Sequence, residues 1–312
     1  MLVRIVKDWT SPNIFRQTPN LSGFWDGITF TEEAVYECDY VIVLNRAPYD
    51  FKVKCPPENV WLITQEPPVR EYNWQKKGFP NYFRVITPFV DDRHTNIVNA
   101  NLALPWHVNK SYDYLKNLKC NHKARNLSWI TSSATARKGH VSRMNFLNYL
   151  KERIDFSLYG RGFHEIDDKF KGINPYKFTL AVENNRAPFY WTEKISDVFL
   201  SWSMPIYYGS PNINEFFPEE SMIIIDIEER ELAVDVIKNA IESDFWSKNI
   251  EAIEYSRNKI LDEYQFFPYI SKMINNNPTS NNRVELTINE LPYLYPSLDF
   301  SYLKNILRYY FK

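Results

Sequence analysis

Short hydrophobic runs alternate with mixed polar and apolar stretches along the first third of the chain. Four runs have the length of buried strands: MLVRIV (1–6), DYVIVLN (39–45), NVWLITQEPP (59–68) and FRVITPF (83–89). The third ends at a Pro-Pro pair and the fourth meets Pro88, and proline stops a strand. Stretches such as TEEAVYE (31–37) between them read as connecting helices. Strands that alternate with helices predict parallel α/β packing.

A second series of the same kind follows the polar stretch KNLKCNHKAR (116–125). Its predicted strands are NLSWITS (126–132), DFSLYGRGF (155–163), YKFTLAVEN (176–184), MPIYYGS (204–210) and SMIIIDI (221–227). Its predicted helices are RMNFLNYLKER (143–153), TEKISDVFLSWS (192–203) and helical segments within 229–267. The order is again strand, helix, strand, which predicts a second α/β domain.

These patterns divide the chain into an N-terminal domain (1–118), a second domain (119–274) and a C-terminal segment (275–312). The C-terminal segment begins with a predicted linker, NNNPTSNN (275–282), and ends in an amphipathic helix, FSYLKNILRYYFK (300–312). That helix suits either packing on the protein body, which we favour, or peripheral contact with a membrane surface. Its apolar runs are too short for a membrane span or a signal peptide.

Composition narrows the function classes. A net charge of -1 gives no support to a nucleic-acid partner. Aromatic residues make up 16% of the chain, and their flat faces suit carbohydrate binding, although we expect most of them in the core. Three scattered cysteines predict no disulfide framework and favour a reducing, cytoplasmic location. The five histidines and the Asp pairs (91–92, 167–168) show no metal-ligand spacing, so we expect a site without metal.

The candidate chemistry lies at the start of the helix in 192–203. Thr192 is a predicted cap, and Glu193 and Lys194 then occupy the first turn. That end of a helix attracts anions, so a lysine there is unfavourable unless a phosphate or another anion accompanies it. A solvated Glu-Lys pair is the alternative interpretation.

The stretch from YKFTLAVENN through YWTEKISDVFLSWSMPIYYGSP to SMIIIDI (176–227) resembles the donor-binding signature of the α1,3/α1,4-fucosyltransferases, glycosyltransferase family 10. That signature runs Y-K-F-x-L-x-F-E-N, a spacer, Y-x-T-E-K, an apolar helix, P-I-x-x-G-x-P and a hydrophobic strand. The resemblance implies two Rossmann-like domains facing across a cleft, the GT-B arrangement, with C-terminal helices. It implies an inverting transferase for L-fucose from GDP-fucose, with a glycan acceptor of the N-acetylglucosamine type and no required cofactor.

Donor roles carry over residue by residue. Glu193 matches the glutamate that holds donor hydroxyls, and Lys194 matches the lysine that holds the nucleotide diphosphate. Asn184 and Tyr190 match further donor-contacting positions. Arg143 is the best match for an arginine that grips the pyrophosphate, with a second arginine of the same basic loop, residue 137, as the alternative.

The first domain carries the expected base. Glu66, in TQEPP, matches the carboxylate proposed to take the proton of the acceptor hydroxyl. Tyr72, Trp74 and Trp106 are candidates for stacking on acceptor sugars, and packing roles are equally open for them. An inactive relative that binds a nucleotide sugar, and a transferase with another donor sugar, are the alternative functions.

Overall fold

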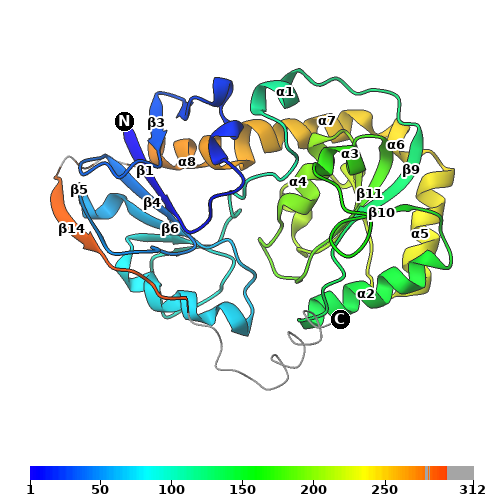
Figure 1. Ribbon diagram of the computed structural model, residues 1–312, viewed down its shortest axis with the longest axis horizontal. Coiled ribbons are helices and arrows are strands. Elements are labelled where there is room, and N and C mark those ends of the chain that lie inside the picture. Colours follow the sequence, from blue (N-terminus) through cyan, green and yellow to red (C-terminus); the bar gives the residue numbers. More distant parts are fainter. Residues whose placement is uncertain (278–279, 281, 294–312) are drawn as a thin grey trace. The chain divides into compact units, whose positions relative to one another are not determined.

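The computed structural model describes residues 1–277, 280 and 282–293 and consists of two compact units (Figure 1). Unit 1 is formed by Met1–Pro105, Ser111–Lys116 and the described residues from Leu261 onward, and unit 2 by Trp106–Lys110 and Asn117–Ile260. Each unit is built on its own, mainly parallel sheet. The predicted α/β class with two Rossmann-like units is therefore confirmed.

The sheet of unit 1 has the strand order β2-β3-β1-β4-β6-β7-β8. All neighbouring strands are parallel except β2 and β3, which form a hairpin. Its strands are β1 Leu2–Lys7, β2 Phe24–Trp25, β3 Ile28–Thr31, β4 Tyr40–Leu44, β6 Val60–Ile63, β7 Arg84–Ile86 and β8 Ile97–Val98. The four hydrophobic runs predicted as strands correspond to β1, β4, β6 and β7.

Both faces of this sheet are covered, because alternate side chains point to opposite faces of a strand. Ile42 and Leu44 of β4 belong to the core on one face, together with Phe266 and Phe267 of α8 (Phe266–Asn275). Val41 and Val43 of the same strand face a second core on the other side. The predicted second domain, which extended to residue 274, is therefore too long, since α8 completes the core of unit 1.

The smaller elements of unit 1 correct two further predictions. The stretch 31–37 is not a helix: it follows β3 and ends in an isolated bridge between Glu37 and Lys54. The segment after residue 275 contains a strand, β14 (Val284–Ile288), which pairs antiparallel with β5 (Phe51–Cys55). The helix predicted for 300–312 lies outside the described residues. The other elements are α1 Tyr112–Asn117 and the short helical turns η1 Ile14–Gln17, η2 Pro19–Leu21, η3 Pro57–Asn59 and η4 Arg70–Asn81.

The sheet of unit 2 is fully parallel, with the order β10-β9-β11-β12-β13. Its strands are β9 Arg125–Ile130, β10 Ser157–Tyr159, β11 Tyr176–Val182, β12 Met204–Tyr208 and β13 Ile223–Ile224. From β9, the chain passes first to one edge of the sheet and then to the other side. In such sheets, ligands bind beyond the carboxyl ends of the strands where the order reverses. In unit 2 that place lies between β9 and β11.

Helices connect these strands, and their bounds are α2 Lys138–Lys151, α3 Lys169–Ile173, α4 Glu193–Leu200, α5 Arg230–Glu242, α6 Phe245–Lys248 and α7 Ile250–Lys259, with turns η5 Ile213–Glu215, η6 Glu219–Ser221 and η7 Ile260–Tyr264. The helix predicted to begin at Arg143 begins earlier, at Lys138. Helix α4 packs its apolar side, Ile195, Val198 and Phe199, inward, as the pattern predicts.

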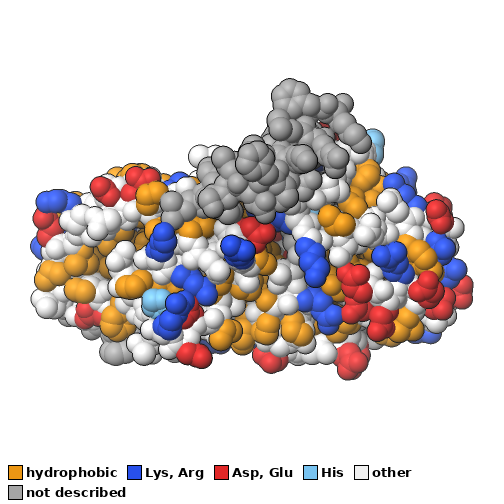
Figure 2. Space-filling view, turned by 90° about the horizontal axis from the view of Figure 1, so that it is seen from below, with side chains coloured by type: hydrophobic (Ala, Val, Ile, Leu, Met, Phe, Trp, Pro, Cys, Tyr) orange, Lys and Arg blue, Asp and Glu red, His pale blue; other side chains and the backbone are white. Residues whose placement is uncertain are grey.

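Figure 2 shows acidic and basic side chains intermixed over the coloured part of one face.

Candidate functional site

Arg143 spans the point in unit 2 where the strand order reverses. From α2, its guanidinium donates to Asn184 Oδ1 at 2.6 Å, and Asn184 follows β11. It also approaches Ser132 Oγ, beyond the end of β9, at 3.4 Å. The Arg143 side chain is buried, and its Nε has no hydrogen-bond partner among the described residues. Arg143 and Asn184, two of the residues predicted for donor binding, therefore lie together where a ligand is expected, and their donor roles stay a prediction.

The first turn of α2 adds to this positive region. The helix begins after Arg137 with no capping side chain and no acidic residue in its first turn. Its exposed backbone N–H groups and dipole therefore favour an anion. Burial, and then the nearby charges of Arg143, Arg137 and Lys194, lower the pKa of His140 to about 4. Its imidazole is neutral near pH 7, and Nδ1 is buried without a partner among the described residues.

Lys194 has an internal counterion that the sequence interpretation missed. Glu183, directly after β11, is 1% exposed. Its carboxylate accepts hydrogen bonds from the Thr192 N–H and hydroxyl, both at 2.8 Å, and from Lys194 Nζ at 3.0 Å. Thr192 caps α4 as predicted, by accepting from the backbone N–H of Lys194. The sequence signal that could have indicated this counterion is a glutamate at a strand end, shortly before a capped helix.

Glu193, the first residue of α4, lies beside two lysines and a histidine. Its Oε1 is 3.5 Å from Lys169 Nζ, 3.6 Å from Lys194 Nζ and 3.8 Å from His107 Nδ1. Burial opposes ionisation, but Lys194, Lys169 and His107 outweigh it and hold the pKa of Glu193 well below its usual range. Glu193 is therefore a carboxylate that can accept hydrogen bonds from a ligand. Lys169 and His107 come from distant segments, and no local pattern pointed to them.

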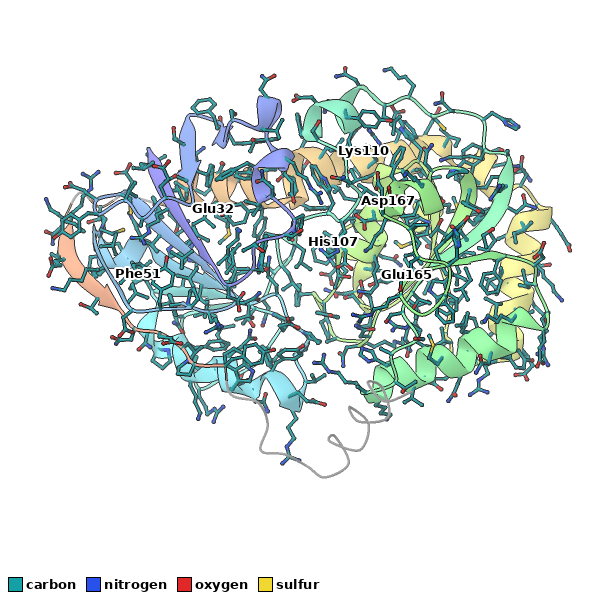
Figure 3. All side chains as sticks on the ribbon, viewed as in Figure 1. Glu32, Phe51, His107, Lys110, Glu165 and Asp167 are labelled. Atoms are coloured by element: carbon teal, nitrogen blue, oxygen red, sulfur yellow. The ribbon has the colours of Figure 1, made fainter. Side chains whose placement is uncertain are left out.

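Two buried aspartates attach the segment Trp106–Lys110 to unit 2. Asp197 accepts from the backbone N–H groups of His107 and Val108 at 2.7 and 3.1 Å. Asp168 accepts from the Asn109 N–H and from Lys110 Nζ, each at 2.9 Å. Figure 3 labels His107 and Lys110 on this segment. Asp168 is thus not a solvated loop residue, because its carboxylate is buried, caps α3 and pairs with Lys110.

The remaining donor candidate, Tyr190, lies in unit 2, and the proposed base, Glu66, lies in unit 1. Tyr190, shortly before α4, is 4% exposed, so its ring is packed within unit 2. Glu66 belongs to unit 1, where it is half-buried just beyond the carboxyl end of β6. The backbone beside it is fixed, since the Gln65 N–H donates to Asn45 Oδ1 at 2.8 Å. The strand predicted over 59–68 ends at Ile63, so Glu66 follows it by three residues, and its role as the base stays a prediction.

The three candidates for acceptor stacking are buried. Tyr72 is 6% exposed and belongs to a core of unit 1, and Trp74 is 8% exposed and packs on Tyr293. Trp106 is 1% exposed and donates to the Lys110 carbonyl. A ring enclosed in this way offers no open face to a sugar, so packing is the role that fits each of them. Among the described residues, no cluster of metal-ligating side chains occurs, and no helix is long and apolar enough to cross a bilayer.

Comparisons with known proteins find similarity to fucosyltransferases. The model described as "Glycosyltransferase family 10 (fucosyltransferase) C-term" matches residues 120–243. The alpha-(1,3)-fucosyltransferase FucT of Helicobacter pylori is 36% identical over 76 residues, which cover 24% of this chain and 16% of that protein. The 4-galactosyl-N-acetylglucosaminide 3-alpha-L-fucosyltransferase FUT6 of Homo sapiens is 24% identical over 212 residues, which cover 64% of this chain and 56% of that protein.

A solved structure, a crystal structure of alpha1,3-fucosyltransferase with GDP-fucose, aligns with a TM-score of 0.48 at 16% identity, covering 85% of this chain and 91% of that one. The matched part is little more than half of the human relative and a smaller share of the bacterial one. The family model covers the whole candidate donor site of unit 2 except the segment 106–110. Through its residues 120–243, the chain is similar to glycosyltransferase family 10, the fucosyltransferases.

Proposed function

We propose that this protein is an inverting α1,3-fucosyltransferase. In this proposal, L-fucose passes from GDP-fucose to an N-acetylglucosamine-type hydroxyl of a glycan or surface polysaccharide. The observation that carries the proposal is the buried Arg143, which lies where the strand order reverses and whose Nε has no hydrogen-bond partner among the described residues. A buried cation with spare donors requires an anion, and a nucleoside diphosphate supplies one.

Donor binding is assigned to unit 2. Arg143 and Lys194, with the first turn of α2, hold the diphosphate, and Glu193 accepts hydrogen bonds from donor hydroxyls. Asn184 orients Arg143, and Tyr190 keeps the donor-contacting role that the family resemblance implies. Negative charge grows on the phosphate oxygens as the sugar leaves, and preorganised cations stabilise that charge. Because Arg143 and Lys194 can provide this stabilisation, we expect transfer to continue in the presence of a chelator.

The chemistry also requires a base for the acceptor hydroxyl. Glu66 fits this role because it is an acidic side chain at the carboxyl end of β6, only partly exposed to solvent. A carboxylate can take the proton of the hydroxyl as its oxygen attacks the anomeric carbon from the face opposite the leaving GDP. Attack from that face inverts the anomeric configuration.

A thermal-shift screen against GDP, UDP, CMP and ADP, without added metal, tests the proposal. A ligand that binds only the folded protein raises its unfolding temperature. We expect selective stabilisation by GDP, followed by transfer from GDP-fucose to N-acetylglucosamine-containing acceptors. Selective stabilisation by another nucleotide would still support a glycosyltransferase but would contradict fucose as the donor sugar. Binding of GDP-fucose with no turnover on any acceptor would favour the inactive relative.

The setting of the enzyme is part of the proposal. Cys38, Cys55 and Cys120 are free thiols, which fits a reducing, cytoplasmic location. The proposed contact with the inner face of a membrane depends on residues 300–312, outside the described part. Vesicle co-sedimentation of the full chain and of a version that ends at residue 293 tests that contact.

A further inference from the structure

The side chain of Lys194 lies at an electrostatically unfavourable place. It belongs to the first turn of α4, where the helix dipole repels cations. It is also largely enclosed, with 22% of the side chain exposed, so its ammonium is partly removed from water. Without a compensating carboxylate, such a lysine would readily lose its proton.

Glu183 provides that compensation and also fixes the direction of the ammonium. Lys194 Nζ donates to Glu183 Oε2 at 3.0 Å and to Thr192 Oγ1 at 2.9 Å. Thr192 in turn donates its hydroxyl proton to Glu183. An ammonium has three N–H groups, so these two bonds leave the third for a ligand atom. The Glu183 side chain is fully buried and therefore out of reach of the ligand itself.

We propose that Glu183 is a positioning residue that keeps the Lys194 ammonium protonated and directed at the donor diphosphate. This inference rests on the proposed function. It deepens that function by assigning a role to a residue that touches neither substrate. Glu183 joins the end of β11 to the first turn of α4, so one carboxylate sets the cap, the charge and the orientation of Lys194.

The charges around Lys194 come from several elements. Glu183 and Glu193 favour its protonated form, whereas Arg143 and burial oppose it. His140 of α2, Lys169 of α3 and His107 also interact with it electrostatically. Burial and the two carboxylates compete, and the carboxylates raise the pKa of Lys194 above its usual value. Glu193 is shared with Lys169 and His107, so Glu183 is its most direct counterion.

The test is Glu183→Gln, which keeps the shape and an acceptor for the Thr192 N–H but removes the charge. GDP affinity of the full chain is measured by titration calorimetry between pH 6 and pH 10. For the wild type, we expect no loss of GDP affinity from deprotonation of Lys194 between pH 6 and pH 10. For Glu183→Gln, we expect affinity to fall about tenfold or more as pH rises, because neutral Lys194 loses a charge-assisted hydrogen bond. The double variant that combines Glu183→Gln with Lys194→Met should lack this additional pH dependence, because it has no lysine at position 194.

Two controls separate positioning from folding. Glu231→Gln removes another carboxylate of unit 2, one that pairs with the Tyr149 hydroxyl at the surface, and should keep the wild-type pH profile. Glu183→Asp keeps the charge but shortens the side chain. We expect Glu183→Asp to bind GDP more weakly at every pH, without the additional loss of affinity at high pH. This variant replaces Glu183→Gln in the test if Glu183→Gln does not fold.

An NMR titration of ¹³C-labelled lysine without GDP gives an independent readout. We expect the Lys194 pKa to fall in Glu183→Gln. In Glu183→Asp, which keeps the charge, we expect it to stay high. A wild type that does not bind GDP would contradict the proposed function, while this titration would still test the pair. An unchanged Lys194 pKa, or an unchanged pH profile in a wild type that binds GDP, would overturn the inference.

Discussion

Gly139 lies directly against the backbone carbonyl of Asn184. A Cβ built at Gly139 would be 1.9 Å from the Asn184 oxygen, far inside van der Waals contact. The first turn of α2 therefore approaches the end of β11 as closely as backbone atoms allow. This approach brings Arg143, one helical turn further along α2, within hydrogen-bond distance of the Asn184 side chain. Absence of a side chain at one position thus sets the geometry of the candidate donor site.

Gly139→Ala should consequently separate α2 from β11. Because the clash is with backbone and not with a flexible side chain, we expect a loss of about 1–3 kcal/mol in unfolding free energy and weaker GDP binding. Denaturant unfolding and calorimetry measure the two effects. Asn145→Ala, at an exposed position of the same helix, should change neither. Unaltered GDP binding in Gly139→Ala would show that the close approach is not required.

Arg143→Met keeps much of the side-chain length but removes the cation. We expect GDP affinity to fall by about 1–3 kcal/mol, the usual contribution of a charge-assisted hydrogen bond. Arg153→Met removes a partly exposed arginine just after α2 and serves as the matched control. Equal GDP affinity in the two variants would exclude Arg143 from the diphosphate site.

Glu66→Gln tests the separation of binding from chemistry. The substitution leaves unit 2 unchanged, so GDP affinity should match that of the wild type. The transfer rate should fall by a factor of about 10²–10⁴, the usual contribution of a general base. Single-turnover assays with saturating donor measure that rate. A folded Glu66→Gln that loses GDP binding, or that retains full transfer, would contradict the assignment.

Lys123 predicts a pH dependence of stability. Its buried Nζ donates to the carbonyl groups of Asn174 and Ser201, and burial lowers the pKa of Lys123 to about 7. Between this value and the unfolded pKa of about 10.4, the unfolded chain binds more protons, so stability should rise with pH. The rise is at most about 1.4 kcal/mol per pH unit. Urea unfolding at pH 7 and pH 9 should show this component in the wild type and not in Lys123→Met.

Local patterns were sufficient for the strands that are hydrophobic runs and for one helix start, but β2, β3, β5, β8 and β14 were not predicted. Strands β4 and β6 are uninterrupted hydrophobic runs, and Thr192 before an apolar helix is a local capping signal. Interactions between distant segments were not accessible in this way. Lys169 and His107 reach Glu193 only through tertiary packing, and Glu183 acts through a strand-to-helix contact.

The errors have the same origin. Residues 31–37 have a mixed polar and apolar pattern, yet Glu37 bridges to Lys54 in a neighbouring segment. The boundary at 274 followed the predicted linker 275–282, whereas Phe266 and Phe267 pack on the sheet of unit 1. Tyr72 and Trp106 show that an aromatic residue between predicted elements can equally be a core residue.

The composition of unit 1 has a consequence for synthesis on the ribosome. Its core includes Phe266, Phe267, Ile270 and Ile274, which are translated after all the strands of unit 2. Unit 2 can therefore complete its fold while the earlier-made sheet still lacks α8. The half of the protein that is translated first is the half that matures last, and chains that stall before α8 would expose an unfinished apolar surface to chaperones and proteases.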